Sequence, residues 1–180
     1  GYTGIAPREK KANTNVMNRD ESGSNGLVLD KYGQLIICMH GDRRIAKLED
    51  WTKKNFSTIV NKYNGRYFNS PNDLVYAKNG DLYFTDPPYG LKNQDNDVLK
   101  ELDFNGVFKL TPTGDLSLII DDLTRPNGIA ISNDQKTLYV AISDTNDRRI
   151  MAYTITSEGV KNPRVFFNDD GLAKELKGNF

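Results

Sequence analysis

Short apolar runs separated by turn-forming residues fill the chain from residue 24 onward. The runs cover residues 26–29, 35–39, 82–84, 106–110, 116–120 and 138–142. Gly, Asn, Asp and Pro stand between them, and the runs are rich in β-branched and aromatic residues, which is typical of strands. Residues 48–61 are long enough for a helix, but Thr58, Ile59 and Val60 favour strand and turn. The pattern therefore predicts an all-β chain.

The two ends of the chain lack this pattern. Residues 1–23 are polar, with mixed charges and no apolar stripe, so we expect a loop or linker there. Residues 172–176 are predicted to form a short terminal turn. The strands are thus expected between these two segments.

One motif occurs three times along the chain. Each copy begins with Asn, continues as an alternating apolar strand and a polar hairpin turn, and ends in a second strand that starts at Leu. The copies start at Asn25, Asn72 and Asn127, at spacings of 47 and 55 residues. Repeats of roughly 40–50 residues built from short strands are typical of β-propeller blades. The sequence therefore predicts about three blades of a single propeller domain over residues 24–180.

Three blades are fewer than a propeller needs. Propellers close with ~4–8 blades, and an open set leaves an apolar face uncovered at each end. Leu27 and Leu29 in the first copy, like Ile129 and Ile131 in the third, alternate along a strand and are expected to pack against a neighbouring blade. We therefore expect the rest of the propeller to come from further sequence or from another chain.

Charge and cysteine content narrow the class of protein. Lys plus Arg and Asp plus Glu both number 24, so the formal net charge is zero, which argues against a nucleic-acid partner. No apolar run approaches the ~20 residues of a membrane helix, so no membrane partner is expected. The single cysteine, Cys38, excludes an intrachain disulfide and is predicted to lie in the core. These features leave a cytoplasmic or periplasmic location open.

Several motifs in order along the chain resemble a known family. They lie at residues 24–27, 40–44, 70–75, 81–90, 104–108, 125–130 and 137–141. They resemble the gluconolactonase branch of the senescence-marker-protein/gluconolactonase/luciferin-regenerating-enzyme family. The resemblance implies a six-bladed propeller that hydrolyses a sugar-acid lactone in carbohydrate metabolism. It also implies one divalent cation in the central channel, which polarises the lactone carbonyl as a Lewis acid. Ca²⁺ is the expected cation, with Mg²⁺ and Zn²⁺ as alternatives.

The resemblance also implies roles for individual residues. Asn127, in Pro-Asn-Gly, matches the family's metal-binding asparagine, and Asn72, in Pro-Asn-Asp, matches a position that binds metal or substrate. The family's acidic ligands lie in Glu-Gly-Pro and Pro-Asp-Gly motifs, which this sequence lacks. Glu9, Glu21 and Asp170 do not stand in those contexts. The catalytic acidic residues are therefore expected outside this chain, and the 180 residues alone are expected to be inactive.

Each candidate residue also has a structural interpretation. Asn72 and Asn127 are ordinary turn formers, and Asn25 either binds substrate or caps its strand. The only histidine, His40, is either structural or a substrate contact, and a general-base role with Asp42 is a further alternative. For Tyr89 the alternatives are a rigid loop over residues 86–89 and the mouth of the substrate pocket.

If the chain is part of an enzyme, the motifs that it lacks leave metal-assisted hydrolysis as the expected mechanism. The sequence has neither a Gly-x-Ser-x-Gly elbow nor a glycine-rich phosphate loop. The alternatives to a lactonase are an ester or organophosphate hydrolase on the same propeller and a non-catalytic propeller that binds a partner protein or a sugar acid. Trp51 is expected to pack in an apolar contact, and the Arg43-Arg44 and Arg148-Arg149 pairs are expected to be solvated.

Overall fold

The computed structural model describes residues 23–168. The expectations for residues 1–22 and 172–176 lie outside this range. Three four-stranded antiparallel sheets follow one another along the chain, in the orders β1-β2-β3-β4, β7-β8-β9-β10 and β11-β12-β13-β14, and β5 and β6 form a small hairpin. In the described range, no helical segment has the length and apolar character needed to cross a membrane.

Between residues 23 and 168 all elements are strands or single 3₁₀ turns. Their bounds are β1 Leu27–Leu29, β2 Leu35–Met39, η2 His40–Asp42, β3 Arg44–Asp50, β4 Asn55–Val60, β5 Lys62–Tyr63, β6 Arg66–Tyr67, β7 Leu74–Tyr76, β8 Leu82–Asp86, η3 Gln94–Asn96, β9 Gly106–Leu110, β10 Leu116–Ile120, β11 Pro126–Ile131, β12 Thr137–Asp144, β13 Asp147–Thr156 and β14 Gly159–Asn168. The all-β prediction is confirmed. Residues 48–61 contain the end of β3 and all of β4, as the Thr and β-branched residues there indicated.

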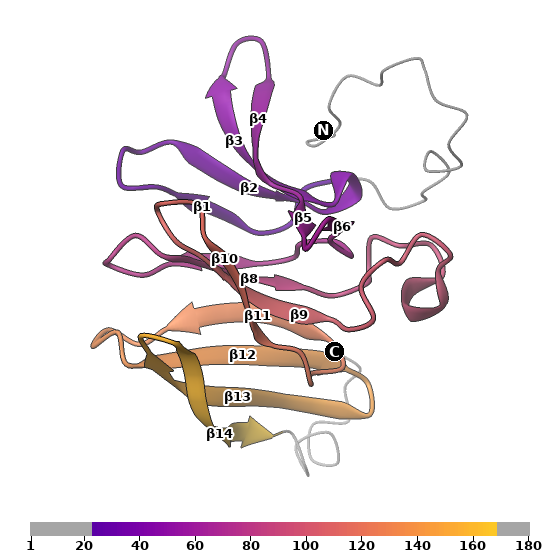
Figure 1. The fold of residues 1–180 in the computed structure, drawn as a ribbon, viewed down its shortest axis with the longest axis vertical. Coiled ribbons are helices and arrows are strands. Elements are labelled where there is room, and N and C mark those ends of the chain that lie inside the picture. Colours follow the sequence, from indigo (N-terminus) through magenta and orange to yellow (C-terminus); the bar gives the residue numbers. More distant parts are fainter. Residues whose placement is uncertain (1–22, 169–180) are drawn as a thin grey trace, which may run out of the picture.

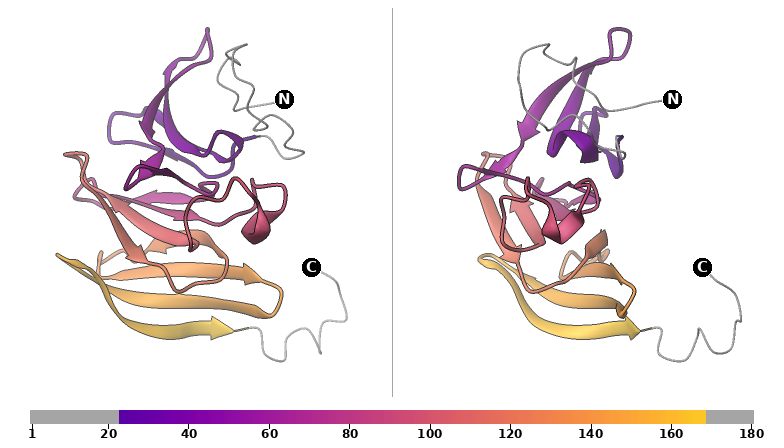
Figure 2. Two further views of the ribbon diagram at one scale, coloured as in Figure 1. Left: turned by 45° about the vertical axis from the view of Figure 1, so that its right-hand side comes forward. Right: turned by 90° about the vertical axis from the view of Figure 1, so that its right-hand side faces the viewer.

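The three sheets are consecutive blades of a β-propeller. They stack in chain order, from the indigo first sheet to the orange and yellow third sheet (Figure 1), and the turned views show the same order (Figure 2). The first strands of the blades face each other, because β7 contacts both β1 and β11. Asn25 and Asn72 lie just before β1 and β7, and Asn127 is the second residue of β11, so the sequence repeat corresponds to the structural one.

Two apolar clusters hold the blades together. The first joins the first two blades and contains Ile36, Cys38, Ile45, Phe68, Phe84 and Phe108. The second joins the second and third blades and contains Tyr83, Val107, Leu138, Val140 and Tyr153. Burial raises the pKa of the Cys38 thiol well above its usual range. Cys38 is therefore an unreactive core residue, as its apolar run predicted.

The outer faces of the first and third blades expose apolar side chains. Leu27 and Leu29 are 58% and 61% exposed, so the prediction that they pack on a neighbouring blade is wrong for the described residues. Val28, which points to the other side of β1, packs against the first cluster instead. Ile129 is buried in the second cluster, as predicted. At the opposite end Phe166 is 58% exposed. Within the described part of the chain, each of these two blades has a neighbouring blade on one side only.

Two further expectations are corrected by the structure. Trp51 is 78% exposed in the turn between β3 and β4, because this turn projects beyond the sheet and no other element covers it. Arg43 is buried rather than solvated. It adopts a left-handed backbone conformation after η2, and its guanidinium donates to the carbonyl oxygens of Phe68 and Tyr67. Arg43 thus joins the first blade to the segment that leads into the second.

Candidate functional site

The backbones of the three repeated asparagines meet where the inner strands begin. Gly26 N–H donates to the carbonyl oxygen of Asn72 (2.6 Å), which links the first blade to the second. The carbonyl oxygen of Thr85 accepts from Asn72 N–H (2.9 Å), and the Thr85 hydroxyl donates to the carbonyl oxygen of Asn127 (2.6 Å). The structure therefore brings the Asn25-Gly26, Asn72 and Asn127 segments side by side.

Asp73 connects the same three segments through its carboxylate. Its Oδ2 accepts from Ile129 N–H (3.0 Å) in the third blade, and its Oδ1 accepts from Leu74 N–H (2.9 Å). On the other side, a Cβ on Gly26 would lie 2.7 Å from the Asp73 Cα and 2.7 Å from its Oδ1. The Gly of the first copy and the Asp of the second thus pack together, because only a residue without a Cβ allows β1 to approach the aspartate this closely.

We expect Gly26→Ala to destabilise the chain by about 1–3 kcal/mol, because the added methyl group overlaps backbone atoms of Asp73 that cannot move away cheaply. Gly128→Ala is the matched control. A Cβ there would meet nothing closer than the Ala141 Cβ at 3.7 Å, so it is expected to leave stability nearly unchanged. Urea denaturation of both variants measures the difference, and equal midpoints would contradict the close approach.

The side chains of the three asparagines differ in their surroundings. Asn72 is only 4% exposed, and within residues 23–168 its side-chain amide makes no hydrogen bond. Asn127 is half-buried and its Nδ2 donates to the Ser143 hydroxyl (3.1 Å), whereas Asn25 is exposed. An amide whose oxygen the protein does not use is available to an added ligand. Asn72 is the strongest candidate ligand by this criterion.

A buried carboxylate supports the segment that precedes Asn72. Asp86 accepts hydrogen bonds from Asn69 N–H and Ser70 N–H, both at 2.7 Å. Burial raises the pKa of the Asp86 carboxyl to about 7, although these two hydrogen bonds and the charges of Arg43 and Lys100 act in the opposite direction. Asp86 therefore fixes the backbone two residues before Asn72.

His40 and Tyr89 lie close to this segment. Ser70 bridges it to the following loop, because its hydroxyl donates to the Pro87 carbonyl oxygen (2.5 Å) and accepts from Gly90 N–H (2.8 Å). A Cβ on Gly90 would lie 3.0 Å from the His40 Cδ2, so the buried imidazole packs directly against the residue after Tyr89. The structure thus places both predicted substrate contacts around one loop, and their roles remain predictions.

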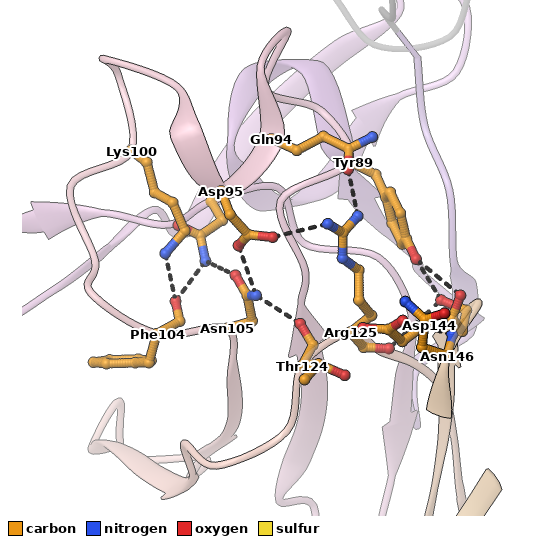
Figure 3. A network of polar contacts seen from close by, with 12 residues as sticks. Tyr89, Gln94, Asp95, Lys100, Phe104, Asn105, Thr124, Arg125, Asp144 and Asn146 are labelled. Carbon is orange, nitrogen blue, oxygen red and sulfur yellow. Dashed lines mark hydrogen bonds and ion pairs between the residues drawn. The ribbon is translucent and has the colours of Figure 1, made fainter. Parts of the chain in front are cut away.

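A polar network continues from this loop to the third blade (Figure 3). Arg125 donates to Asp95 Oδ2 (2.9 Å) and to the Gln94 side chain, and its guanidinium lies 5.4 Å from the centre of the Tyr89 ring. Asp95 Oδ1 accepts from Asn105 Nδ2 (2.9 Å), which connects Arg125 to the end of the second blade. The residue two positions before Asn127 is therefore anchored by the 89–97 loop.

Asp73, Thr85, Asp86 and Ser143 are among the residues of this arrangement that were not predicted from the sequence. For Asp73 a signal was available, because an acidic residue occupies the position that is Gly in the other two copies. For Asp86, which precedes a Pro-Pro pair, the sequence predicts only a rigid loop. Thr85 and Ser143 are recognisable only once the blades are placed together.

The donor set bears on the expected metal ion. Between residues 23 and 168, no three His, Cys, Asp or Glu side chains gather as a metal-binding group. The candidate ligands in this range are the amide oxygens of Asn72 and Asn127. Amide oxygens are hard donors, which fit Ca²⁺ or Mg²⁺ better than Zn²⁺. The residues present thus fit part of a hard-cation site.

The sequence matches one family model over nearly its whole length. The model of the SMP-30/Gluconolactonase/LRE-like region matches residues 5–178. A gluconolactonase of Zymomonas mobilis subsp. mobilis is 44% identical over 160 residues, which cover 85% of this chain and 45% of that protein. Lactonohydrolase oryL of Aspergillus oryzae is 35% identical over 83 residues, or 46% of this chain and 19% of that protein.

Solved structures show the same relationship. XC5397 of Xanthomonas campestris, described as a gluconolactonase, superposes with a TM-score of 0.72 at 34% identity, over 81% of this chain and 48% of that one. A luciferin-regenerating enzyme gives a TM-score of 0.63 at 19% identity, over 83% of this chain and 48% of that one, so the likeness concerns the fold alone. The chain spans about half the length of the relatives it matches.

Proposed function

Since the chain belongs to the SMP-30/gluconolactonase/LRE-like family, we propose that it supplies three blades of an enzyme that hydrolyses a sugar-acid lactone. The observation that carries this proposal is the Asn72 side chain, which is 4% exposed, makes no hydrogen bond in the described range and lies beside the Asn127 segment. The 44% identity to a gluconolactonase supports the substrate class.

Asn72 and Asn127 would hold a divalent cation through their amide oxygens. When bound, such a cation supplies Lewis-acid polarisation of the lactone carbonyl. In the net reaction water adds to that carbonyl carbon, the ring C–O bond breaks, and a hydroxy acid results. His40 and Tyr89, which lie around the same loop, would contact substrate hydroxyls, and Asn25 is the most peripheral of the three asparagines because it is exposed. The acidic groups that complete the site are expected on other blades.

A chimera tests this proposal in a closed ring. Residues 23–168 replace the matching segment of the Zymomonas mobilis gluconolactonase, and proton release from glucono-δ-lactone is followed at constant pH. We expect turnover that a chelator abolishes and that excess Ca²⁺ restores. Asn72→Ala in the chimera is expected to lower kcat/KM by at least about 10-fold, as for loss of metal-site groups generally.

The control substitution is Asn79→Ala, in an exposed hairpin turn of the same blade. It is expected to leave kcat/KM unchanged. A folded chimera whose turnover resists the chelator would exclude the metal mechanism. Unchanged kcat/KM for Asn72→Ala would remove Asn72 from the site.

A further inference from the structure

The amide of Asn127 is held in one orientation by its neighbour on β12. Asn127 Nδ2 donates to the Ser143 hydroxyl oxygen at 3.1 Å. In the part of the chain that the structure describes, no donor reaches Asn127 Oδ1. The two ends of the amide are thus distinguished: the nitrogen is used by the protein, and the oxygen is left for something else.

Ser143 is itself fixed by two other residues. Its backbone N–H donates to the Arg125 carbonyl oxygen (3.0 Å), and its hydroxyl lies 2.6 Å from the Tyr89 hydroxyl. If Tyr89 donates to Ser143 Oγ, the serine proton points to the Arg125 carbonyl oxygen, which lies 3.5 Å away. Ser143 Oγ then has no proton left to donate to Asn127. Asn127 must therefore present its NH₂ group as a donor to Ser143 Oγ.

Tyr89 comes from a different blade and is held by Arg125. The guanidinium lies over the Tyr89 ring at 5.4 Å and is bound on its other side by Asp95 and Gln94 (Figure 3). The Arg125 side chain is 24% exposed and the Asp95 side chain 41%. The 89–97 loop thus holds Tyr89 in place, and the Tyr89 hydroxyl contacts the Ser143 hydroxyl, which accepts from Asn127.

We propose that Ser143, held by Tyr89, is a positioning residue that turns the Asn127 amide so that its oxygen faces a hard divalent cation. The inference rests on the proposed function, because it takes Asn127 as a cation ligand. An amide in the opposite orientation would direct its NH₂ group, which carries partial positive charge, at the cation. Groups that orient a ligand in this way generally affect metal affinity by about 10–100-fold.

The orientation can be tested without any metal. In the ¹⁵N-labelled 180-residue chain, the Asn127 side-chain NH₂ protons should show nuclear Overhauser contacts to Ser143 and to the Tyr89 ring. Ser143→Ala should remove these contacts, because the hydroxyl that holds the amide in one orientation is lost. Ser143→Thr, which keeps the hydroxyl, should restore them. Absence of the Ser143 contact in the unsubstituted chain would overturn the inference.

Ca²⁺ titration of the chimera tests the link to the cation, because the acidic groups expected on the other blades are present there. Ser143→Ala and Tyr89→Phe are expected to weaken Ca²⁺ binding by at least about 10-fold. The Ser143→Thr variant should bind Ca²⁺ nearly as tightly as the unsubstituted protein does. Ser117→Ala, an exposed serine on β10, is the matched control and should leave affinity unchanged.

The outcomes separate this inference from the proposed function. If Asn127→Ala weakens Ca²⁺ binding and Ser143→Ala does not, the positioning role is wrong and the ligand assignment stands. If Asn127→Ala leaves the affinity unchanged, Asn127 is not a ligand and both fail. Absence of any Ca²⁺-dependent change at Asn127 in the chimera without these substitutions also counts against both.

Discussion

Phe108→Ala is expected to lower the free energy of unfolding by about 3–5 kcal/mol, the usual cost of removing a buried phenylalanine ring. Phe108 is fully buried on β9. Its ring stacks on Phe84 (5.2 Å between centroids) and meets Phe68 edge-on (5.1 Å) and Tyr63 at a tilt (5.3 Å). Its removal leaves a cavity among three other rings. Urea denaturation of the 180-residue chain measures the loss.

The matched control is Phe166→Ala at the other end of the molecule. Phe166 is 58% exposed and its ring meets that of Tyr139 edge-on at 4.9 Å. Its removal is expected to cost about 1 kcal/mol, the value of one aromatic pair with little burial. Similar losses for the two variants would show that the Phe108 cluster does not hold the first two blades together.

The strand pattern was accessible from the sequence because strand periodicity and turn chemistry are local properties. The hairpin after β11, for example, is defined by Ser132 and Asp134, whose side chains bond to nearby backbone and to each other. The side of a strand that is buried is not local. Leu27 and Val28 carry equivalent apolar side chains, and only the position of β1 at the end of the stack determines that Val28 is the buried one.

The site was predictable in part for the same reason. The repeat alone aligned Asn72 with Asn127, and Thr85, which bonds to Asn72 within the second blade and to Asn127 in the third, confirms that these segments are neighbours. Ser143 could not be found in this way, because it follows Asn127 by 16 residues. The pairing of Pro126 with Ile142 in the β11-β12 ladder brings it beside the amide. Contacts that arise from register are invisible until the strands are paired.

Asp86 is the other residue with a large expected effect, here on the pH dependence of stability. Its pKa is raised by burial to about 7 in the folded chain, whereas an unfolded aspartate titrates near pH ~3.9. Between these values the folded chain retains a proton that the unfolded chain has released. The free energy of unfolding therefore falls as the pH rises through this window, by up to about 4 kcal/mol from this group.

Asp86→Asn isolates this contribution, because the amide has the same shape, cannot ionise and keeps one oxygen for the Asn69 or Ser70 N–H donors. All other titrating groups are the same in both chains, so their effects cancel in the comparison. Urea denaturation at pH ~4 and pH ~8, on either side of the window, should show a larger loss of stability for the unsubstituted chain than for the variant. Parallel pH profiles would mean that Asp86 is already ionised in the folded chain at low pH. Its two short hydrogen bonds would then outweigh burial, and the carboxylate would stabilise the segment before Asn72 at every pH above ~4.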